Sequence, residues 1–177
     1  EVLQPGPLTT VQDRGRPGWA HVGVPRAGAL DRPAADLANR LVGNPPGAAL
    51  LETTLGGVVV RATSAMTVAV TGAECEVRVG GRARPFATAV AVAAGSEVVV
   101  GPARHGVRSY LAVSGGVDVE PVLGSRATDT LAHVGPPVLA AGQVLPVGTA
   151  SASPSGAEAH HLVRRSAAPV GCRVRAT

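Results

Sequence analysis

A positive charge and a phenol lie two residues apart in the sequence, at Arg108 and Tyr110. Both fall in the run 107–113, which predicts a β-strand, and residues i and i+2 of a strand share one face. A strand at the mouth of a barrel aims such alternate side chains at one cavity. We therefore expect Arg108 and Tyr110 to lie side by side in a site, where they can stabilise developing negative charge.

A carboxylate that can serve the same site ends the apolar run 48–52. Glu52 is interpreted either as the buried partner of an arginine or as the acid of the site. Because a buried arginine without a carboxylate is unfavourable, we expect Arg108 to pair with Glu52 or with Asp13. Glu52, Arg108 and Tyr110 are the predicted catalytic residues.

Further polar residues lie in and after a long loop, 12–30, that is rich in glycine and proline. Loops of this length usually bind a ligand or act as lids, because ordering them costs roughly 1–2 kcal/mol per residue. Asp13 can also simply cap a turn, and the glycines suit turn positions with positive φ. The predicted substrate-binding residues of this region are Gln12, Asp13, Arg16, Asn39 and Asn44.

A short helix should follow the loop. Asp31 can cap its start, and Ala34, Leu37, Ala38 and Leu41 repeat at helical spacing, whereas Asp36, Asn39 and Arg40 take the opposite face. Gly43 supplies the stop. If the apolar stripe packs on a barrel, it pins the loop in place and brings Asp13, Arg16 and Asn44 to the rim near Arg108.

The rest of the chain predicts a mainly β fold. Glycine (23) and proline (15) are abundant, and short apolar runs separated by turn residues recur at near-regular spacing. The expected strands are 8–11, 48–52, 58–60, 66–71, 74–79, 89–92, 97–100 and 107–113, with a Gly80-Gly81 hairpin turn and a final edge strand at 142–148. We expect a sandwich or small barrel over residues 1–148 and a linker with a short further segment over 149–177.

Several other classes of protein are disfavoured. The 5 histidines show no metal-ligand spacing, and no glycine-rich loop followed by Lys and Ser or Thr is present. All 16 basic residues are arginines and they are scattered, which argues against nucleic acid. The two cysteines are far apart and are expected to be reduced thiols. With neither a leader nor a membrane span expected, we predict a cytoplasmic protein.

Several ordered stretches carry a family resemblance. They are TTVQDRGR (9–16), GVP (23–25), ANRLVGN (38–44), LETTL (51–55), VTGA (70–73), RSYLAV (108–113) and LGSR (123–126). Together they resemble the family that is variously called allophanate hydrolase subunit 2, the biotin-dependent carboxyltransferase subunit, and the C subunit of 5-oxoprolinase. This family also matches the Kip-type antagonist and the carboxyltransferase region of urea carboxylase.

The resemblance implies a cyclophilin-like β-barrel over residues 1–148, normally one of two such units in a longer chain, so that residues 149–177 would be a linker and the start of a missing second half. It also implies a Kip-inhibitor-like companion subunit 1 that shares the site. It implies a small amide or lactam substrate, for which the polar residues above offer planar hydrogen-bond partners and a charge for an oxyanion. The leading hypothesis is one subunit of a two-subunit bacterial enzyme in which the complete assembly consumes ATP.

Two alternatives stay open from the sequence. One is a Kip-type regulatory module that sequesters a kinase inhibitor, with the exposed Trp19 of the long loop as an anchor. The other is a carboxyltransferase, whose biotin would arrive on a separate carrier because the chain contains no Met-Lys acceptor. The choice among urea, allophanate and 5-oxoproline is not encoded in the shared motifs.

Overall fold

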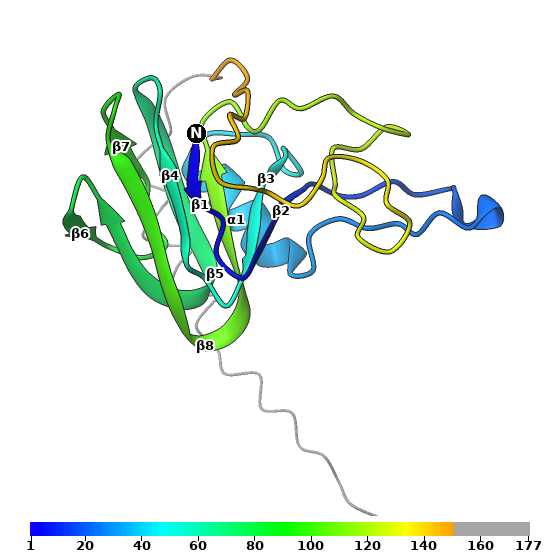
Figure 1. The fold of residues 1–177 in the computed structure, drawn as a ribbon, viewed down its shortest axis with the longest axis horizontal. Helices are drawn as coiled ribbons and strands as arrows, with labels where there is room; N and C mark the ends of the chain where they lie inside the picture. The colour runs from blue at the N-terminus through cyan, green and yellow to red at the C-terminus, as the bar shows by residue number, and fades with distance from the viewer. Residues whose placement is uncertain (151–177) are drawn as a thin grey trace, which may run out of the picture.

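A single curled sheet of antiparallel strands forms the body of the protein (Figure 1). The computed structural model describes residues 1–150 of the 177-residue chain. Its elements are β1 (Val2–Gln4), β2 (Leu8–Gln12), the 3-10 turn η1 (Ala20–Val22), α1 (Arg32–Leu41), β3 (Leu50–Thr54), β4 (Val58–Arg61), β5 (Met66–Val79), β6 (Arg82–Arg84), β7 (Val90–Val92) and β8 (Glu97–Val113). The expected mainly β fold with one helix and a long loop is confirmed. The predicted boundary near residue 148 stays a prediction, and Cys172 and most of 149–177 lie outside the described residues.

Strand β8 organises the sheet. Its first part pairs with β4, its last part pairs with β3, and β5 pairs along its other edge. The sheet order is β1-β4-β8-β3-β2, and β5 also carries the short strands β6 and β7. Antiparallel neighbours joined by tight turns, such as Gly80-Gly81 between β5 and β6, need no crossover helices.

Four of the predicted strands are parts of two long, bent strands, β5 and β8. The expected break between 71 and 74 is a bend inside β5, and the one between 100 and 107 lies inside β8. The pairing of β5 with β8 shifts register beyond Gly72, as a β-bulge does, and bulges bend a strand without ending it. Gly72 has φ +87°, and a Cβ atom there would come within 2.5 Å of the Arg108 carbonyl oxygen. The glycine was therefore a sign of close approach, not of a chain break.

The irregular segment that follows β8, residues 114–150, lies along both edges of the main sheet, which are β1 and β2. Thr128 and Leu139 donate their N–H groups to carbonyls of β2, at 2.8 and 2.9 Å, and Gly142 donates to Val2 of β1 at 2.8 Å. The predicted edge strand 142–148 is wrong, since this stretch forms no regular strand and its ladder pairing is limited to the isolated bridge Val117↔Val147. Pro146 has no N–H to offer to a ladder, which explains why a regular strand does not form there.

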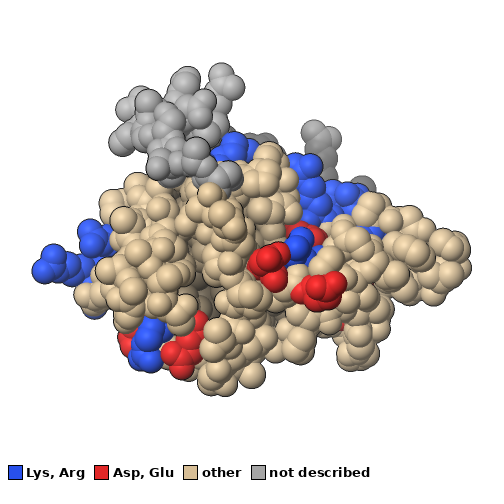
Figure 2. Space-filling model, turned by 90° about the horizontal axis from the view of Figure 1, so that it is seen from above, with Lys and Arg blue, Asp and Glu red and all other residues tan. Residues whose placement is uncertain are grey.

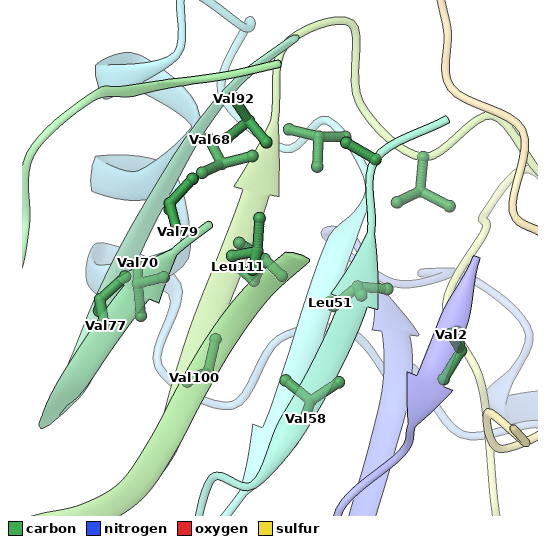
Figure 3. Packing of buried hydrophobic residues seen from close by; sticks show 14 of the residues in the cluster. Val2, Leu51, Val58, Val68, Val70, Val77, Val79, Val92, Val100 and Leu111 are labelled. Atoms are coloured by element: carbon green, nitrogen blue, oxygen red, sulfur yellow. The ribbon is translucent and has the colours of Figure 1, made fainter. Parts of the chain in front are cut away.

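The two faces of the sheet bury different groups. The larger core, rich in valine, fills the inside of the curl and includes Leu51, Val70 and Leu111 (Figure 3). Their neighbours Leu50, Ala69 and Ala112 point to the opposite face, where they pack under α1. The predicted helix is confirmed in its cap, its buried stripe and its end, because Asp31 accepts from the Ala34 N–H at 3.1 Å and Gly43 has φ +79°.

Candidate functional site

The ion pair between Glu52 and Arg108 joins two neighbouring strands. Glu52 of β3 lies opposite Tyr110, and Thr54 lies opposite Arg108. The Arg108 Nε atom is 3.5 Å from Glu52 Oε1, and Glu52 Oε2 accepts the Leu30 N–H at 2.9 Å. The Arg108 side chain is 28% exposed and that of Glu52 is 8% exposed. The expected carboxylate partner of Arg108 is therefore present and is Glu52, although the Nε atom makes no hydrogen bond.

Tyr110 lies beneath the start of α1. It is fully buried in the cluster under the helix, and its hydroxyl accepts the Asp31 N–H at 2.7 Å. Burial, and then the nearby charge of Glu52, hold the pKa of Tyr110 above its ordinary value. The hydroxyl fixes the residue that caps the helix, so Tyr110 connects the sheet to the end of the long loop.

The cavity on the inside of the sheet is not lined by Arg108 or Tyr110. This cavity of about 60 Å³ has a mostly apolar lining that includes Leu51, Leu111 and Val113. Arg108 and Tyr110 face the other side, which α1 covers. The predicted shared face was correct, and it lies on the side that the helix covers, away from the 60 Å³ cavity. The alternating pattern cannot say which of two half-buried faces encloses the larger core.

Asp13 fastens the long loop to a second loop. Its Oδ1 atom accepts from the Gly15 N–H at 2.7 Å and from the Ser125 hydroxyl at 2.6 Å, and its Oδ2 atom accepts from the Arg126 N–H at 2.7 Å. Its carbonyl oxygen accepts the Ala29 N–H at 2.9 Å. The interpretation of Asp13 as a turn cap is confirmed, and the same carboxylate also bridges segments more than a hundred residues apart.

Gln12 and Arg16 extend this network inward. The Gln12 amide donates to the Thr128 carbonyl at 3.0 Å. Arg16 is 1% exposed; its guanidinium donates to the Ala127 carbonyl and lies 3.9 Å from Asp129. Arg126, which precedes Asp129 in the same loop, pairs with Asp118 at 2.7 Å and not with Asp129.

Asn39 and Asn44 form a third group at the end of the helix. The Asn44 amide donates to Asn39 Oδ1 at 3.0 Å and to the Val113 carbonyl at 2.8 Å, and its oxygen accepts the Gly115 N–H at 2.8 Å. Asn39 donates to the Ala48 carbonyl at 2.9 Å. Its placement on the exposed face of the helix was wrong, since Asn39 is fully buried. Hydrogen bonds satisfy the amide, which makes its burial tolerable.

The structure thus separates the predicted site residues into three groups. Asn44 contacts Val113, which lies five residues from Arg108 along β8, about 16 Å at the rise of a strand. Asp13 reaches the Glu52 pair only through the neighbouring N–H groups of Ala29 and Leu30. The expected gathering of Asn44 at the Arg108 rim is therefore wrong. The predicted catalytic and substrate-binding roles themselves are not tested by these contacts and stay predictions.

Sequence reasoning missed several members of these groups. The Leu30 N–H, which holds Glu52, and the carbonyls of Val122 and Ala127, which receive Arg16, are backbone groups. Residue type carries no signal for such contacts. Ser125 could have been suspected, because its small hydroxyl lies in a polar, turn-rich stretch, but nothing in the spacing pairs it with Asp13.

In residues 1–150, no group of three or more His, Cys, Asp or Glu side chains is arranged to hold a metal ion. The helices of this part of the chain are all too short or too polar to cross a membrane. A cavity of about 330 Å³ is lined by residues between 128 and 138, among them Asp129, His133 and Gly135. The Cys75 thiol is buried and free, and burial raises its pKa.

Comparison with known proteins confirms the resemblance carried by the motifs. The C subunit of 5-oxoprolinase from Escherichia coli strain K12 is 42% identical over 151 residues, covering 84% of this chain and 49% of that protein. Urea amidolyase of Saccharomyces cerevisiae is 38% identical over 136 residues, covering 76% of this chain and 7% of that protein. The urea carboxylase structure of Kluyveromyces lactis is 34% identical with a TM-score of 0.82, covering 89% of this chain and 15% of that one.

The chain spans about half the length of the Escherichia coli protein. The model of the carboxyltransferase domain, subdomain A and B, matches residues 22–175, which are most of the chain. The match includes the helix, all strands from β3 onward and the polar groups around Glu52 and Asn44. The chain therefore belongs to the family of the carboxyltransferase domain, subdomain A and B.

Proposed function

We propose that this chain is part of one subunit of a bacterial, two-subunit enzyme that hydrolyses a small amide or lactam in an ATP-dependent reaction. The observation that carries the proposal is the 42% identity with the C subunit of 5-oxoprolinase over 84% of the chain. A relative named as a subunit implies companion subunits, and the expected partner is the Kip-inhibitor-like subunit 1. We also propose a cytoplasmic location, where such an enzyme would find ATP.

The Glu52–Arg108 pair is the proposed contribution of this chain to the chemistry. A guanidinium next to an amide carbonyl stabilises the negative charge that develops on its oxygen during attack. Arg108 is partly exposed while Glu52 holds it in place, so it is accessible to a substrate that the companion subunit presents. Tyr110 supports this pair from below, since its hydroxyl fixes Asp31 next to the Leu30 N–H that binds Glu52.

ATP would enter as a co-substrate of the complete assembly. The chain has no lysine and no Walker-type loop, so arginines or the companion subunit would have to bind the phosphates. Arg26 is a candidate for binding the phosphates, because its side chain is exposed and makes no ion pair among the described residues. Its positive charge, which suits the negative phosphates, is the support that the described residues give to ATP binding.

A second candidate function is carboxyl transfer. It is favoured by the family that the chain belongs to and by its 34% identity with the urea carboxylase structure. In that case carboxybiotin would have to arrive on a separate carrier protein, because the chain offers no lysine for its attachment. The Kip-type regulatory role remains the binding-only alternative.

Reconstitution separates these functions. The full-length protein is combined with its companion subunit and assayed on 5-oxoproline, allophanate and urea, each with and without ATP. Turnover that needs ATP and both subunits supports the proposal, and bicarbonate-dependent carboxylation of carrier biotin supports the second candidate. Failure of the reconstituted complex to turn over any of the three amides would end the hydrolase proposal.

A further inference from the structure

The 330 Å³ cavity is lined by residues of the loop 128–138, which lies beside the edge strand β2 (Figure 1, yellow). This loop is held at both ends, because the N–H groups of Thr128 and Leu139 donate to carbonyls of β2 at 2.8 and 2.9 Å. Between these points the Asp129 N–H donates to the Val134 carbonyl at 2.9 Å and closes the loop on itself. The cavity is therefore formed before any ligand arrives, and its volume is in the range of sites for small molecules.

Polar groups without partners gather at the wall of this cavity. In the described part of the chain, the few buried side-chain atoms that make no hydrogen bond include Thr128 Oγ1, Asp129 Oδ2 and Arg16 Nη1. Thr128 and Asp129 line the cavity and are 5% and 6% exposed. Arg16 lies directly behind the wall, since a Cβ atom on the lining residue Gly135 would come within 2.9 Å of its Nη2 atom. Proteins rarely leave buried polar groups unsatisfied, so a ligand or water should complete this set.

The charges at the wall favour a neutral ligand. Asp129 Oδ2 lies 3.9 Å from Arg16 Nη1, which is close enough to balance its charge but too far for a hydrogen bond. A cation would gain little from a carboxylate that is already neutralised, and an anion would be repelled by it. Figure 2 shows a similar balance on the surface, where acidic side chains lie beside basic ones in the middle and at the lower left of that face. The carboxylate can still accept a hydrogen bond, so its fitting partner is an uncharged donor.

An uncharged group that offers an N–H and a carbonyl on one edge matches the two lining residues. The N–H would donate to Asp129, and the Thr128 hydroxyl would donate to the carbonyl oxygen. Lactams and primary amides carry both groups on the same edge, whereas an open-chain secondary amide in the usual trans form holds them on opposite sides. Pro136, Pro137 and Val138 add apolar surface to the lining, which suits the hydrocarbon part of such a molecule.

We infer that the loop 128–138 binds a small lactam or primary amide in this cavity, with Asp129 and Thr128 on its polar edge. The inference goes beyond the proposed function, because it shares the ligand class but not the site: Glu52 and Arg108 do not line this cavity. It concerns binding alone and needs neither ATP nor the companion subunit. Its test therefore uses the full-length protein by itself.

Titration calorimetry with the neutral lactam 2-pyrrolidinone measures the binding. We expect saturable, one-to-one binding with a Kd of about 1 mM or lower. N-methyl-2-pyrrolidinone keeps the ring but has no N–H, so it should bind at least about 10-fold more weakly, because the hydrogen bond to the carboxylate is lost. This comparison uses the unaltered protein and does not depend on the folding of a variant. In amide NMR spectra, the N–H groups of Leu131 and Ala132, which donate to Asp129, should shift on binding.

Two variants locate the ligand. Thr128→Val keeps the side-chain shape but removes the hydroxyl, and it should weaken the binding of 2-pyrrolidinone about 5-fold. The matched control is Thr88→Val, which should leave binding unchanged, because the Thr88 hydroxyl donates to the Phe86 carbonyl at 3.2 Å and does not line the cavity. Binding that is lost in Arg108→Ala but retained in Thr128→Val would place the ligand at the Glu52–Arg108 pair and overturn the inference. Absence of saturable binding, which would leave only water at these groups, or equal affinity for the N-methyl compound would also overturn it.

Discussion

Removal of the Arg16 guanidinium should destabilise the protein strongly without touching the sheet. Arg16 is 0% exposed in its side chain and Asp129 is 4% exposed, with 3.9 Å between Arg16 Nη1 and Asp129 Oδ2. With an effective dielectric constant of about 20, Coulomb's law gives an attraction of about 4 kcal/mol at this distance. Loss of one partner from a buried pair typically costs about 3–5 kcal/mol, because the other charge remains buried. We expect Arg16→Ala to lower the free energy of unfolding by this amount.

Urea unfolding followed by circular dichroism measures the effect. A domain is typically stable by about 5–15 kcal/mol, so Arg16→Ala should remain folded at 25 °C but shift the midpoint far down. Asp129→Asn removes the charge while an amide oxygen can still accept the Leu131 and Ala132 N–H groups. In the double variant Arg16→Ala with Asp129→Asn, the loss should be about 2 kcal/mol smaller than the sum of the single losses.

Two results would refute this reasoning. If Arg16→Ala costs less than about 1 kcal/mol, water reaches the pair and its burial does not matter for stability. If the double variant is additive, the two charges do not interact, and Arg16 stabilises the protein only through the Ala127 and Val122 carbonyls.

Three further predictions concern the other polar groups. Tyr110 is the only tyrosine, so absorbance at 295 nm should show no phenolate near pH 10 while the protein is folded, and an ordinary titration would contradict the burial. Above that pH the free energy of unfolding should fall by about 1.4 kcal/mol per pH unit, because only the unfolded chain ionises, and Tyr110→Phe should lack this slope. Arg108→Ala should abolish turnover by the reconstituted enzyme yet cost at most about 1 kcal/mol in urea unfolding, because the side chain is partly exposed; full turnover would remove Arg108 from the site. Asn44→Ala should cost at least about 2 kcal/mol in the same assay, because the Asn39 oxygen, the Val113 carbonyl and the Gly115 N–H lose their partner; a smaller loss would show that water replaces the amide.

Local signals predicted local structure well. The Asp31 cap, the apolar stripe and Gly43 are all within reach of one helix, and the helix formed as expected. Breaks at glycine were over-interpreted, because Gly72 permits a bend in a paired strand as readily as it permits a turn. The difference depends on the partner strand β8, which is distant in the sequence.

The grouping of the polar residues could not be predicted for the same reason. Arg16 contacts Ala127, 111 residues away, and the contact is to a backbone carbonyl that every residue possesses. Asn39 looked exposed on the helical pattern, yet the chain around Ala48 returns to cover it. The pairing of Arg108 with a carboxylate was predictable because an unpaired buried charge is so unfavourable.

The most direct test of the proposed function measures ATP hydrolysis that is stimulated by 5-oxoproline. The full-length protein and its companion subunit are assayed separately and together, with opening of the lactam followed in the same samples. The proposal predicts that lactam opening and ATP hydrolysis appear together and only when this protein is present. Full turnover by the companion subunit alone would contradict it.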